Sequence, residues 1–485
     1  MASGRHFLFA AMVLIGSPAC QKNGGPPLGT GGVTPGTGGL ATGGGGAGWD
    51  GSVAGAGGLA DGGSDAASCQ FTVSTNEVSA QIPTVGVVEW SLAGDPPASA
   101  KIVYTLKNGA ASLLNQGGEA PVPLANANYR TLLLGLKQSK DYTFHIEASR
   151  GGSSCVSPDY ALPTTGRLPN APNVTVNVAQ PELREPGFIV TSSGTFVPDS
   201  AFIIDADGEI VWYFPGPVDT ARAQMDYEGN NMWMIALNVL NEDGEMRYVS
   251  MDGAESYQNV PGLEDAHHDF TVMPGGKVAA LVWSIPGDDV PSDLVVRSPD
   301  GGVTTPFTIG SNLYLSDTFH ANAIHYLPSA DSFTIADRNP SVVVDVSSAG
   351  VPAWQLGGVC DGAPTGNHCS PQSWQVNHGH HLLDDGTLLV FNNTETSGVA
   401  HVLEFQLSNT PGALSATLVH DYPGTAASST LGDVQRLPGG NTLVTYSNAA
   451  VIEELDPNWN VVQTFSVRVG YSNWRPTLYG PPLRL

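Results

Sequence analysis

The sequence predicts an all-β protein in which a six-bladed β-propeller follows a small β-sandwich. Short segments that alternate apolar and polar residues recur along the chain, and no stretch has the apolar spacing of an amphipathic helix. From about residue 175 onward, a strand–turn–strand unit repeats at the interval that is typical of propeller blades. A chain of 485 residues is long enough to form both parts.

The N-terminal segment has the pattern of an export signal. Arg5 precedes an apolar run over residues 7–15, and small residues then lead to Cys20. The run is too short to span a bilayer, so it predicts a cleaved signal at residues 1–20. A cysteine at this point predicts lipidation of Cys20 and a lipid anchor on the periplasmic or outer face of a bacterial membrane. A plain secretory signal with an incidental cysteine is the alternative.

The next segment, residues 21–67, consists mostly of Gly, Ala, Thr and Ser. Such a composition cannot bury a core, and it predicts a flexible tether. A tether directly after a lipid anchor holds the folded part of the chain away from the bilayer.

The cysteine count agrees with export. The chain has five cysteines, and lipidation of Cys20 leaves Cys69, Cys155, Cys360 and Cys369. In an oxidising compartment we expect two disulfides. Pairing the first two of these four would close a loop of domain size and pairing the last two a short loop, although the sequence permits the other two pairings. No spacing matches a standard zinc motif, so we predict no metal.

Residues 69–165 predict the β-sandwich. Alternating apolar segments cover residues 85–92, 101–106 and 142–148. The stretch 129–144 resembles the strand–turn–strand corner of fibronectin type III domains, and the length of the segment suits a small fibronectin-III-like β-sandwich. This part of the chain contains no evident catalytic constellation.

Residues 175–485 predict the propeller because two elements alternate along them. The first is a strand, a turn and a second strand, at residues 224–235, 270–281, 324–335, 380–390 and 434–444. The second is an Asp/Gly hairpin, often followed by an aromatic strand, at residues 205–214, 298–302, 348–354 and 456–465. Their alternation predicts six four-stranded blades around a central channel.

The repeat also predicts which polar side chains meet. His268 lies eight residues before Gly276, and His378 lies eight residues before Gly386. In the blade between them Asn322 takes this position, and His320 is two residues earlier on the same strand face. We therefore expect these side chains to converge at one end of the channel.

The charge balance makes the few cations informative. Only 13% of residues are charged, and the formal net charge is -26. Such a chain will not attract nucleic acid or an anionic membrane through its overall field, so an anionic substrate needs a local cation. Arg338 follows the second strand of the His320 blade, and its guanidinium can bind a tetrahedral oxyanion in two-pronged fashion. This set suits a sulfate or phosphate ester and lacks the carboxylate pair of glycoside hydrolysis.

Other histidines have weaker support. In the adjacent pairs that contain His268 and His380, strand alternation turns one ring of each pair away from the channel. His378 and His380 share a strand face by this alternation, so His380 is a rival to His378. His325 and His420 have no repeat support, and we assign them no function.

The order and spacing of these motifs resemble the bacterial arylsulfate sulfotransferase family over residues 175–485. The family's general plan, a β-sandwich ahead of a six-bladed propeller, is also similar. The matching segments are residues 267–270, 317–322, 336–338, 354–358, 374–378 and 474–479.

The resemblance implies transfer of a sulfuryl group from a phenolic sulfate ester to a phenol acceptor, without a nucleotide sulfate donor or another cofactor. Carried over to this sequence, it makes His378 the nucleophile that forms a sulfohistidine, and His268, His320 and Arg338 the groups that hold the sulfuryl oxygens. A neutral imidazole must attack sulfur, and a nearby arginine cation favours that neutral form.

Further residues are expected to contact the substrates. Asn322 and Asn377 flank the histidines, and the family usually has Gln where this chain has Asn377. Trp354, Phe319 and Trp374 are the candidates for the apolar walls around a phenol ring, although core packing is the alternative for each.

Two other functions remain open from the sequence. A non-catalytic propeller at the cell surface would bind a ligand in its channel or a protein on its outer face. A sulfate-ester hydrolase would use the same site with water in place of the phenol acceptor.

Overall fold

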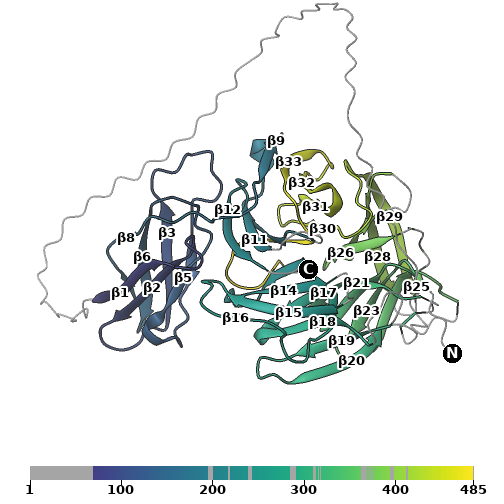
Figure 1. The fold of residues 1–485 in the computed structure, drawn as a ribbon, viewed down its shortest axis with the longest axis horizontal. Helices are drawn as coiled ribbons and strands as arrows, with labels where there is room; N and C mark the ends of the chain where they lie inside the picture. Colours follow the sequence, from purple (N-terminus) through teal and green to yellow (C-terminus); the bar gives the residue numbers. More distant parts are fainter. Residues whose placement is uncertain are drawn as a thin grey trace, which may run out of the picture. The chain divides into compact units, whose positions relative to one another are not determined.

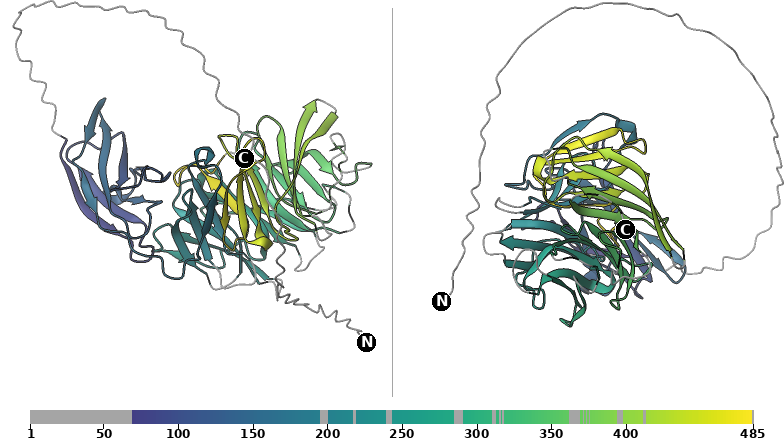
Figure 2. Two further views of the ribbon diagram at one scale, coloured as in Figure 1. Left: turned by 90° about the horizontal axis from the view of Figure 1, so that it is seen from above. Right: turned by 90° about the vertical axis from the view of Figure 1, so that its right-hand side faces the viewer.

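The computed structural model describes residues 69–483 except for 195–199, 217–218, 239–242, 285–290, 310–312, 315, 317, 362–368, 371, 373, 375, 394–397 and 411–412. The predicted signal, Cys20 and the tether lie outside the described residues. Everything described belongs to one compact unit, and the two groups of strands in it are shown in Figure 1 and, from two further directions, in Figure 2.

Two antiparallel sheets occupy the first part of the described chain. One contains β1 (Phe71–Val78), β2 (Gly86–Leu92) and β5 (Thr131–Leu133). The other contains β4 (Gly117–Pro121), β3 (Ser99–Leu106), β6 (Tyr142–Arg150) and β7 (Ser153–Val156), and β8 (Tyr160–Leu162) also pairs with β6. The predicted alternation is observed, since every second residue of β6 is buried in a core shared by both sheets.

Within the described ranges, six further sheets follow, numbered here 1 to 6. Sheet 1 contains β12 (Ile210–Pro215), β11 (Ser200–Asp205), β10 (Phe188–Ser192) and β34 (Ser472–Arg475). Sheet 2 contains β13 (Asp219–Met225), β14 (Asn231–Asn238), β15 (Asp243–Ser250) and β16 (Ser256–Tyr257). Sheet 3 contains β17 (Ala266–Met273), β18 (Lys277–Trp283), β19 (Ser292–Arg297) and β20 (Val303–Ile309).

The remaining sheets continue the same order. Sheet 4 contains β21 (Ala321–Leu327), β22 (Ser332–Asp337), β23 (Val342–Ser347), β24 (Pro352–Gly357) and β25 (Cys369–Ser370). Sheet 5 contains β26 (Asn377–Leu382), β27 (Thr387–Asn392), β28 (His401–Thr410) and β29 (Ala413–Pro423). Sheet 6 contains β30 (Asp433–Arg436), β31 (Thr442–Tyr446), β32 (Val451–Leu455), β33 (Val461–Ser466) and β9 (Thr175–Val178).

The two ends of this region are joined through their sheets. The late strand β34 pairs with the early strand β10, and β9 pairs with β33, beside which it lies in Figure 1. One strand of each sheet also contacts the corresponding strand of the next sheet, in the order β34, β13, β17, β21, β26 and β30, and β30 contacts β34. We call these the six contacting strands.

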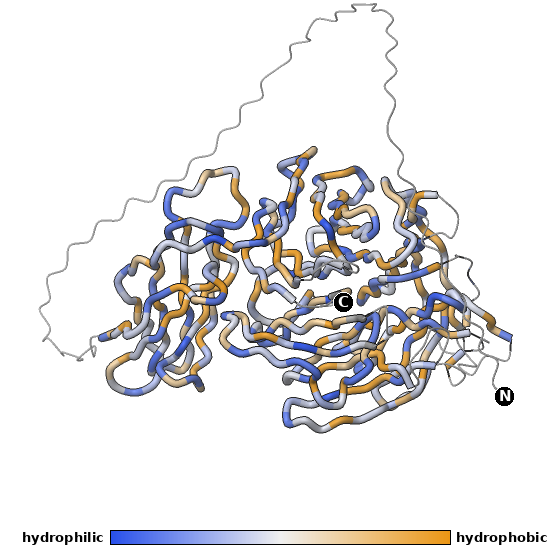
Figure 3. The backbone as a smooth tube through the Cα atoms, viewed as in Figure 1, coloured by the Kyte–Doolittle hydropathy of each residue, from blue (hydrophilic) through white to orange (hydrophobic). Residues whose placement is uncertain are grey.

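Apolar side chains hold neighbouring sheets together. Leu281 and Leu294 of sheet 3 share a buried cluster with Ile324 and Phe333 of sheet 4, and further clusters join the other sheets. The hydropathy colouring of Figure 3 shows the apolar and polar segments that alternate along the strands. Removing this apolar surface from water supplies the main stabilisation of such sheets.

The helices among the described residues are single turns of 3₁₀ type, η1 (Ala127–Tyr129), η2 (Pro181–Leu183), η3 (Pro274–Gly276) and η4 (Ser447–Ala449). In the described part of the chain, no helix has the length and apolar character that crossing a membrane requires. The turn glycines Gly276 and Gly386, which fix the repeat, have φ of 70° and 84°, a region that side chains disfavour.

The described part of the chain contains two disulfides, Cys69–Cys155 and Cys360–Cys369. The expectation of two disulfides is therefore confirmed, and the pairing is the one that closes a domain-sized loop and a short loop. Both are of the kind that forms in oxidising compartments.

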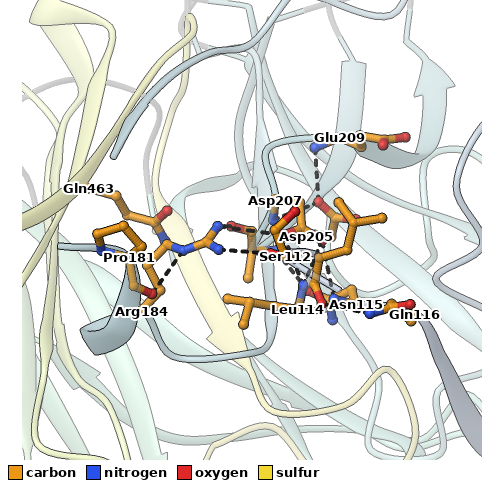
Figure 4. Close-up of polar contacts among 12 residues, drawn as sticks. Ser112, Leu114, Asn115, Gln116, Pro181, Arg184, Asp205, Asp207, Glu209 and Gln463 are labelled. Carbon is orange, nitrogen blue, oxygen red and sulfur yellow. Dashed lines mark hydrogen bonds and ion pairs between the residues drawn. The ribbon is translucent and has the colours of Figure 1, made fainter. Parts of the chain in front are cut away.

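A polar cluster ties the first two sheets to sheet 1 (Figure 4). The Asp207 carboxylate accepts the backbone N–H groups of Leu114 and Asn115, and Asn115 Oδ1 accepts the Ala206 N–H. The buried Lys137 ammonium forms ion pairs with Asp205 and Asp207, the latter at 3.0 Å. Since each buried charge has a partner of opposite sign, the cluster avoids the cost of an unpaired buried ion.

Candidate active site

The predicted histidines lie where the contacting strands are irregular. The strand register skips between Thr220 and Arg222, between Ala266 and Phe270, between Ala321 and Ala323, and between Asn377 and His380. The positions that the repeat aligned, His268, Asn322 and His378, each lie within one of these skips, and so does Ala221, which lies eight residues before the turn glycine Gly229. A β-bulge redirects the side chain at the extra residue, so the same device recurs in four sheets.

His268 is the residue most constrained by its bulge. Its φ is 54°, which is uncommon for a residue with a side chain. Its ring meets that of His320 edge to face at 4.6 Å, and its Nδ1 lies 2.8 Å from Nδ1 of His267. The structure therefore brings together two of the predicted site residues, from sheets 3 and 4.

His267 supports His268 from the side. Its Nε2 lies 2.8 Å from Ser292 Oγ, and its ring stacks on Trp283 with centroids 4.6 Å apart. Sequence alternation turned one member of this pair away from the channel and gave it no role. The Nδ1–Nδ1 contact instead makes His267 a direct partner of His268.

Arg338 is joined to His320 through the backbone. The Arg338 N–H donates to the His320 carbonyl at 3.1 Å, and the His320 N–H donates to Asp337 Oδ1 at 2.8 Å. Asp337, at the end of β22, is buried and also accepts a hydrogen bond from the Tyr314 hydroxyl. The Arg338 Nε is buried without a hydrogen-bond partner among the described residues, so this donor is available to a ligand.

His378 lies in the bulge of β26 and is 3% exposed. Its Nδ1 is 2.6 Å from Asn393 Oδ1. Its pKa is lowered to about 3, chiefly by burial; the charges of His320 and Arg338 act in the same direction, and the hydrogen bond to Asn393 acts against them. The imidazole is therefore neutral at physiological pH, as a nucleophilic nitrogen must be.

The same charges act on His268. Burial lowers its pKa well below the usual value, and His320, His267, His378 and Arg338 each contribute repulsion. Since Coulomb interactions fall with distance, these mutual effects agree with convergence of the four predicted residues on one site.

His380 belongs to different surroundings, and the expectation that it shares a strand face with His378 is wrong. The bulge between Asn377 and His380 adds a residue and breaks the alternation. The His380 Nε2 lies 2.8 Å from Thr334 Oγ1, and its ring meets that of His325 at 4.6 Å. Burial lowers its pKa to about 3, and the charges of His381 and Arg222 act in the same direction.

A buried ionic cluster around Arg222 lies between the surroundings of His380 and those of His378. Arg222 Nε and Nη2 donate to Asp269 at 2.6 and 2.9 Å, and Arg222 Nη1 donates to Asp433 at 2.8 Å. The guanidinium also lies over the Tyr471 ring at 4.3 Å. Arg222, Asp269 and Asp433 immediately follow Ala221, His268 and Gly432, each of which lies eight residues before a turn glycine, a signal in the repeat that sequence reasoning missed. They link β13, β17 and β30 across the space between the contacting strands.

The two predicted asparagines are held by the protein itself. Asn322 Nδ2 donates to the Asn377 carbonyl at 2.8 Å, while Asn377 Oδ1 accepts the Trp374 indole N–H at 3.0 Å. Asn322 Oδ1 is buried and has no partner among the described residues. The Asn322 side chain thus joins β21 to β26 beside His378, and Asn322 retains an acceptor for a substrate.

The three predicted aromatic residues are buried in apolar clusters. Trp354 and Trp374 share a cluster between sheets 4 and 5, and the Trp374 ring lies 5.8 Å from that of Phe405. Phe319 packs 5.9 Å from Tyr314 in the cluster between sheets 3 and 4. The structure thus gives each of them a packing role, and contact with a phenol stays a prediction.

Among the described residues, no group of three His, Cys, Asp or Glu side chains is arranged to hold a metal ion. What the site offers is three imidazoles and a guanidinium, in a largely buried setting. Such groups can supply a nitrogen nucleophile and hydrogen bonds to developing negative charge.

Comparison with known proteins gives one family match. Residues 304–468 match the family described as arylsulfotransferase (ASST), a segment that contains His320, Arg338 and His378. This confirms the predicted resemblance over residues 304–468, a segment that does not include His268. No curated protein matches the chain.

Similar solved structures include a protein of unknown function from Bacteroides caccae, at 14% identity and a TM-score of 0.37, covering 59% of this chain and 94% of that one. Another is virginiamycin B lyase from Staphylococcus aureus, at 12% identity and a TM-score of 0.36, covering 60% and 88%. Likenesses of this degree assign neither a fold nor a function.

Proposed function

We propose that this protein transfers a sulfuryl group from a phenolic sulfate ester to a phenol through a sulfohistidine on His378, a proposal that the match of residues 304–468 to the arylsulfotransferase family supports. The observations that carry the proposal are the ring contact of His268 with His320, the backbone hydrogen bond from Arg338 to His320, and the burial of His378, whose pKa the charges of His320 and Arg338 help to lower. These four residues come from sheets 3, 4 and 5.

Each group has a role in the proposed reaction. A neutral His378 nitrogen attacks sulfur, the bond from sulfur to the aryl oxygen breaks, and a phenolate leaves. Arg338, His268 and His320 bind the sulfuryl oxygens and the leaving oxygen, where negative charge develops. A second phenol then attacks the sulfohistidine, which gives ping-pong kinetics.

The proposed frame is a six-bladed β-propeller preceded by a fibronectin-III-like sandwich. The six sheets, the ring of contacts among their six contacting strands and the pairing of β34 with β10 support the propeller. We also propose export and lipid anchoring through Cys20, which the signal pattern and the two disulfides support.

The test is release of 4-nitrophenol from 4-nitrophenyl sulfate, with and without a second phenol, by the wild type and by His378→Ala. His420→Ala is the matched control, because His420 stacks on Trp459 in sheets 5 and 6. Acceptor-dependent release that is lost only in His378→Ala supports the proposal.

The other outcomes favour the competing functions. Release that does not depend on the acceptor identifies a sulfate-ester hydrolase. No release by the folded wild type with any phenolic donor contradicts the proposal and favours a non-catalytic binding protein.

A further inference from the structure

Asn393 directly follows β27 and is 1% exposed. Its Nδ2 lies 2.8 Å from the Ser428 carbonyl and 2.7 Å from the Leu431 carbonyl. Carbonyl oxygens only accept hydrogen bonds, so the NH₂ end of the amide must face these two groups. The orientation of the amide is therefore determined by its surroundings.

That orientation fixes the protonation of His378. The Asn393 oxygen faces His378 Nδ1 at 2.6 Å, and an amide oxygen can only accept. His378 Nδ1 must therefore carry the proton of the neutral imidazole, which leaves the lone pair on Nε2. Sequence reasoning missed Asn393 because it belongs to none of the matched motifs.

We propose that Asn393 is a positioning residue that holds His378 in the Nδ1–H tautomer, so that Nε2 is the atom that receives the sulfuryl group. The inference rests on the proposed function of His378 and adds the reacting atom and the residue that selects it.

The proposed step balances in atoms and charge. The Nε2 lone pair forms the bond to sulfur, and the electron pair of the broken sulfur–oxygen bond leaves on the phenolate. The imidazole keeps its Nδ1 proton and becomes cationic, so its hydrogen bond to Asn393 becomes charge-assisted. An interaction that strengthens as charge develops lowers the barrier more than it tightens donor binding. The acceptor phenol later loses its proton to water and takes the sulfuryl group from Nε2.

The two carbonyls that orient Asn393 are themselves fixed. The Ser428 hydroxyl donates to the Thr430 carbonyl at 3.1 Å, and the Thr430 N–H donates to Asn448 Oδ1 at 2.8 Å. Leu431 has φ of 54° in the segment that enters β30. The segment between β29 and β30 thus holds Asn393, which in turn holds His378.

The direct test is ¹⁵N NMR of the full chain with labelled histidine, in which the His378 signals are identified by their loss in His378→Ala. We expect neutral His378 with the proton on Nδ1. A proton on Nε2 overturns the inference, whatever the activity of the protein. The correct tautomer in a protein that transfers no sulfuryl group would instead contradict the proposed function alone.

Variants add a kinetic readout. Asn393→Leu keeps the volume and Asn393→Ala leaves room for water, and both remove the acceptor. We expect the first-turnover release of nitrophenol to slow about 10- to 100-fold, with little change in donor KM and a mixed tautomer at His378. Wild-type rates and a single tautomer in both folded variants would overturn the inference.

The matched control is Asn441→Leu. Asn441 is also buried, and its amide donates to the Leu183 carbonyl at 2.7 Å and to Glu454 at 2.6 Å, in sheet 6 and the segment before sheet 1. Its side chain and backbone N–H donate hydrogen bonds to Leu183, Glu185 and Glu454 among the described residues, so its loss should lower stability without slowing the first turnover. Slowing equal to that of Asn393→Leu would reduce the role of Asn393 to general stability.

Discussion

The described residues contain two groups of buried histidines that look alike and differ in their arginine. His268 and His378 lie near Arg338, whereas His325 and His380 lie near Arg222. Burial keeps the rings of both groups neutral. Arg222 is neutralised by Asp269 and Asp433, while Arg338 keeps an unsatisfied donor.

The difference shows that a cluster of histidines is not by itself an anion site. A bound sulfuryl group needs a cation that still has a free hydrogen-bond donor. Among the described residues near His378, Arg338 is the cation that has one. The Arg222 group is instead a structural feature, because its charges satisfy one another between three sheets.

The largest expected effect separates the two histidines of β26. His378→Ala should reduce acceptor-dependent sulfuryl transfer by about 10³-fold or more, because the nucleophile is lost. His380→Gln, which can keep a hydrogen bond to Thr334, should change kcat only a few-fold at most. Steady-state rates with 4-nitrophenyl sulfate and a phenol acceptor decide the matter, and a reversed order would assign the reaction to His380.

Substitution of the two arginines should affect different properties, catalysis for Arg338 and stability for Arg222. Arg338→Gln should lower kcat/KM by about 10²- to 10³-fold with little loss of stability, since it removes charge where the sulfuryl oxygens bind. Arg222→Met should lower the free energy of unfolding by about 3–5 kcal/mol, because Asp269 and Asp433 would remain buried without their partner.

Kinetics and denaturant unfolding of both arginine variants test this contrast. If Arg338→Gln mainly unfolds the protein, or if Arg222→Met mainly slows a stable one, the division into two groups is mistaken.

Stability should fall in acid, and buried histidines of both groups should contribute to the loss. The pKa values of His378 and His380 are lowered from 6.5 to about 3, chiefly by burial. Between these values the unfolded chain binds protons that the folded chain does not, so these histidines reduce stability progressively as the pH falls through that window. Urea unfolding across this range should show a shallower dependence for His380→Gln. An identical slope would mean that His380 is not neutral in the folded protein.

The smallest expected effect concerns the partners of the rings. Thr334→Val removes the hydrogen bond to His380 Nε2 and should cost about 1 kcal/mol of stability with no effect on transfer. Asn393→Leu, the corresponding change beside His378, should slow transfer. Equal kinetic effects of the two changes would remove the functional distinction between the groups.

The sequence repeat predicted much of this site because the repeat has a fixed geometry. The offset from the turn glycine aligned His268 with His378, the alignment of the blade between them added Asn322, and all three lie in register shifts of their strands. The bulge in β26 also explains why strand alternation wrongly predicted that His380 and His378 share a strand face. One extra residue in a strand reverses the face of everything beyond it.

Other features could not be read from one segment. The Arg222 cluster joins residues far apart in the sequence, although each follows an aligned position of the repeat. Asn393 is recognised only through the carbonyls of Ser428 and Leu431, which belong to the segment before sheet 6. Trp354 and Trp374 were predicted to contact a phenol because they lie next to a motif. Both are buried in an apolar cluster, and packing in the core explains their position equally well.

The most direct measurement of the central claim is mass spectrometry of the full chain after reaction with 4-nitrophenyl sulfate in the absence of an acceptor. We expect one added sulfuryl group on the peptide that carries His378, which a phenol removes and which is absent from His378→Ala. Transfer without any adduct, or an adduct on another residue that turns over at the same rate, would contradict this claim.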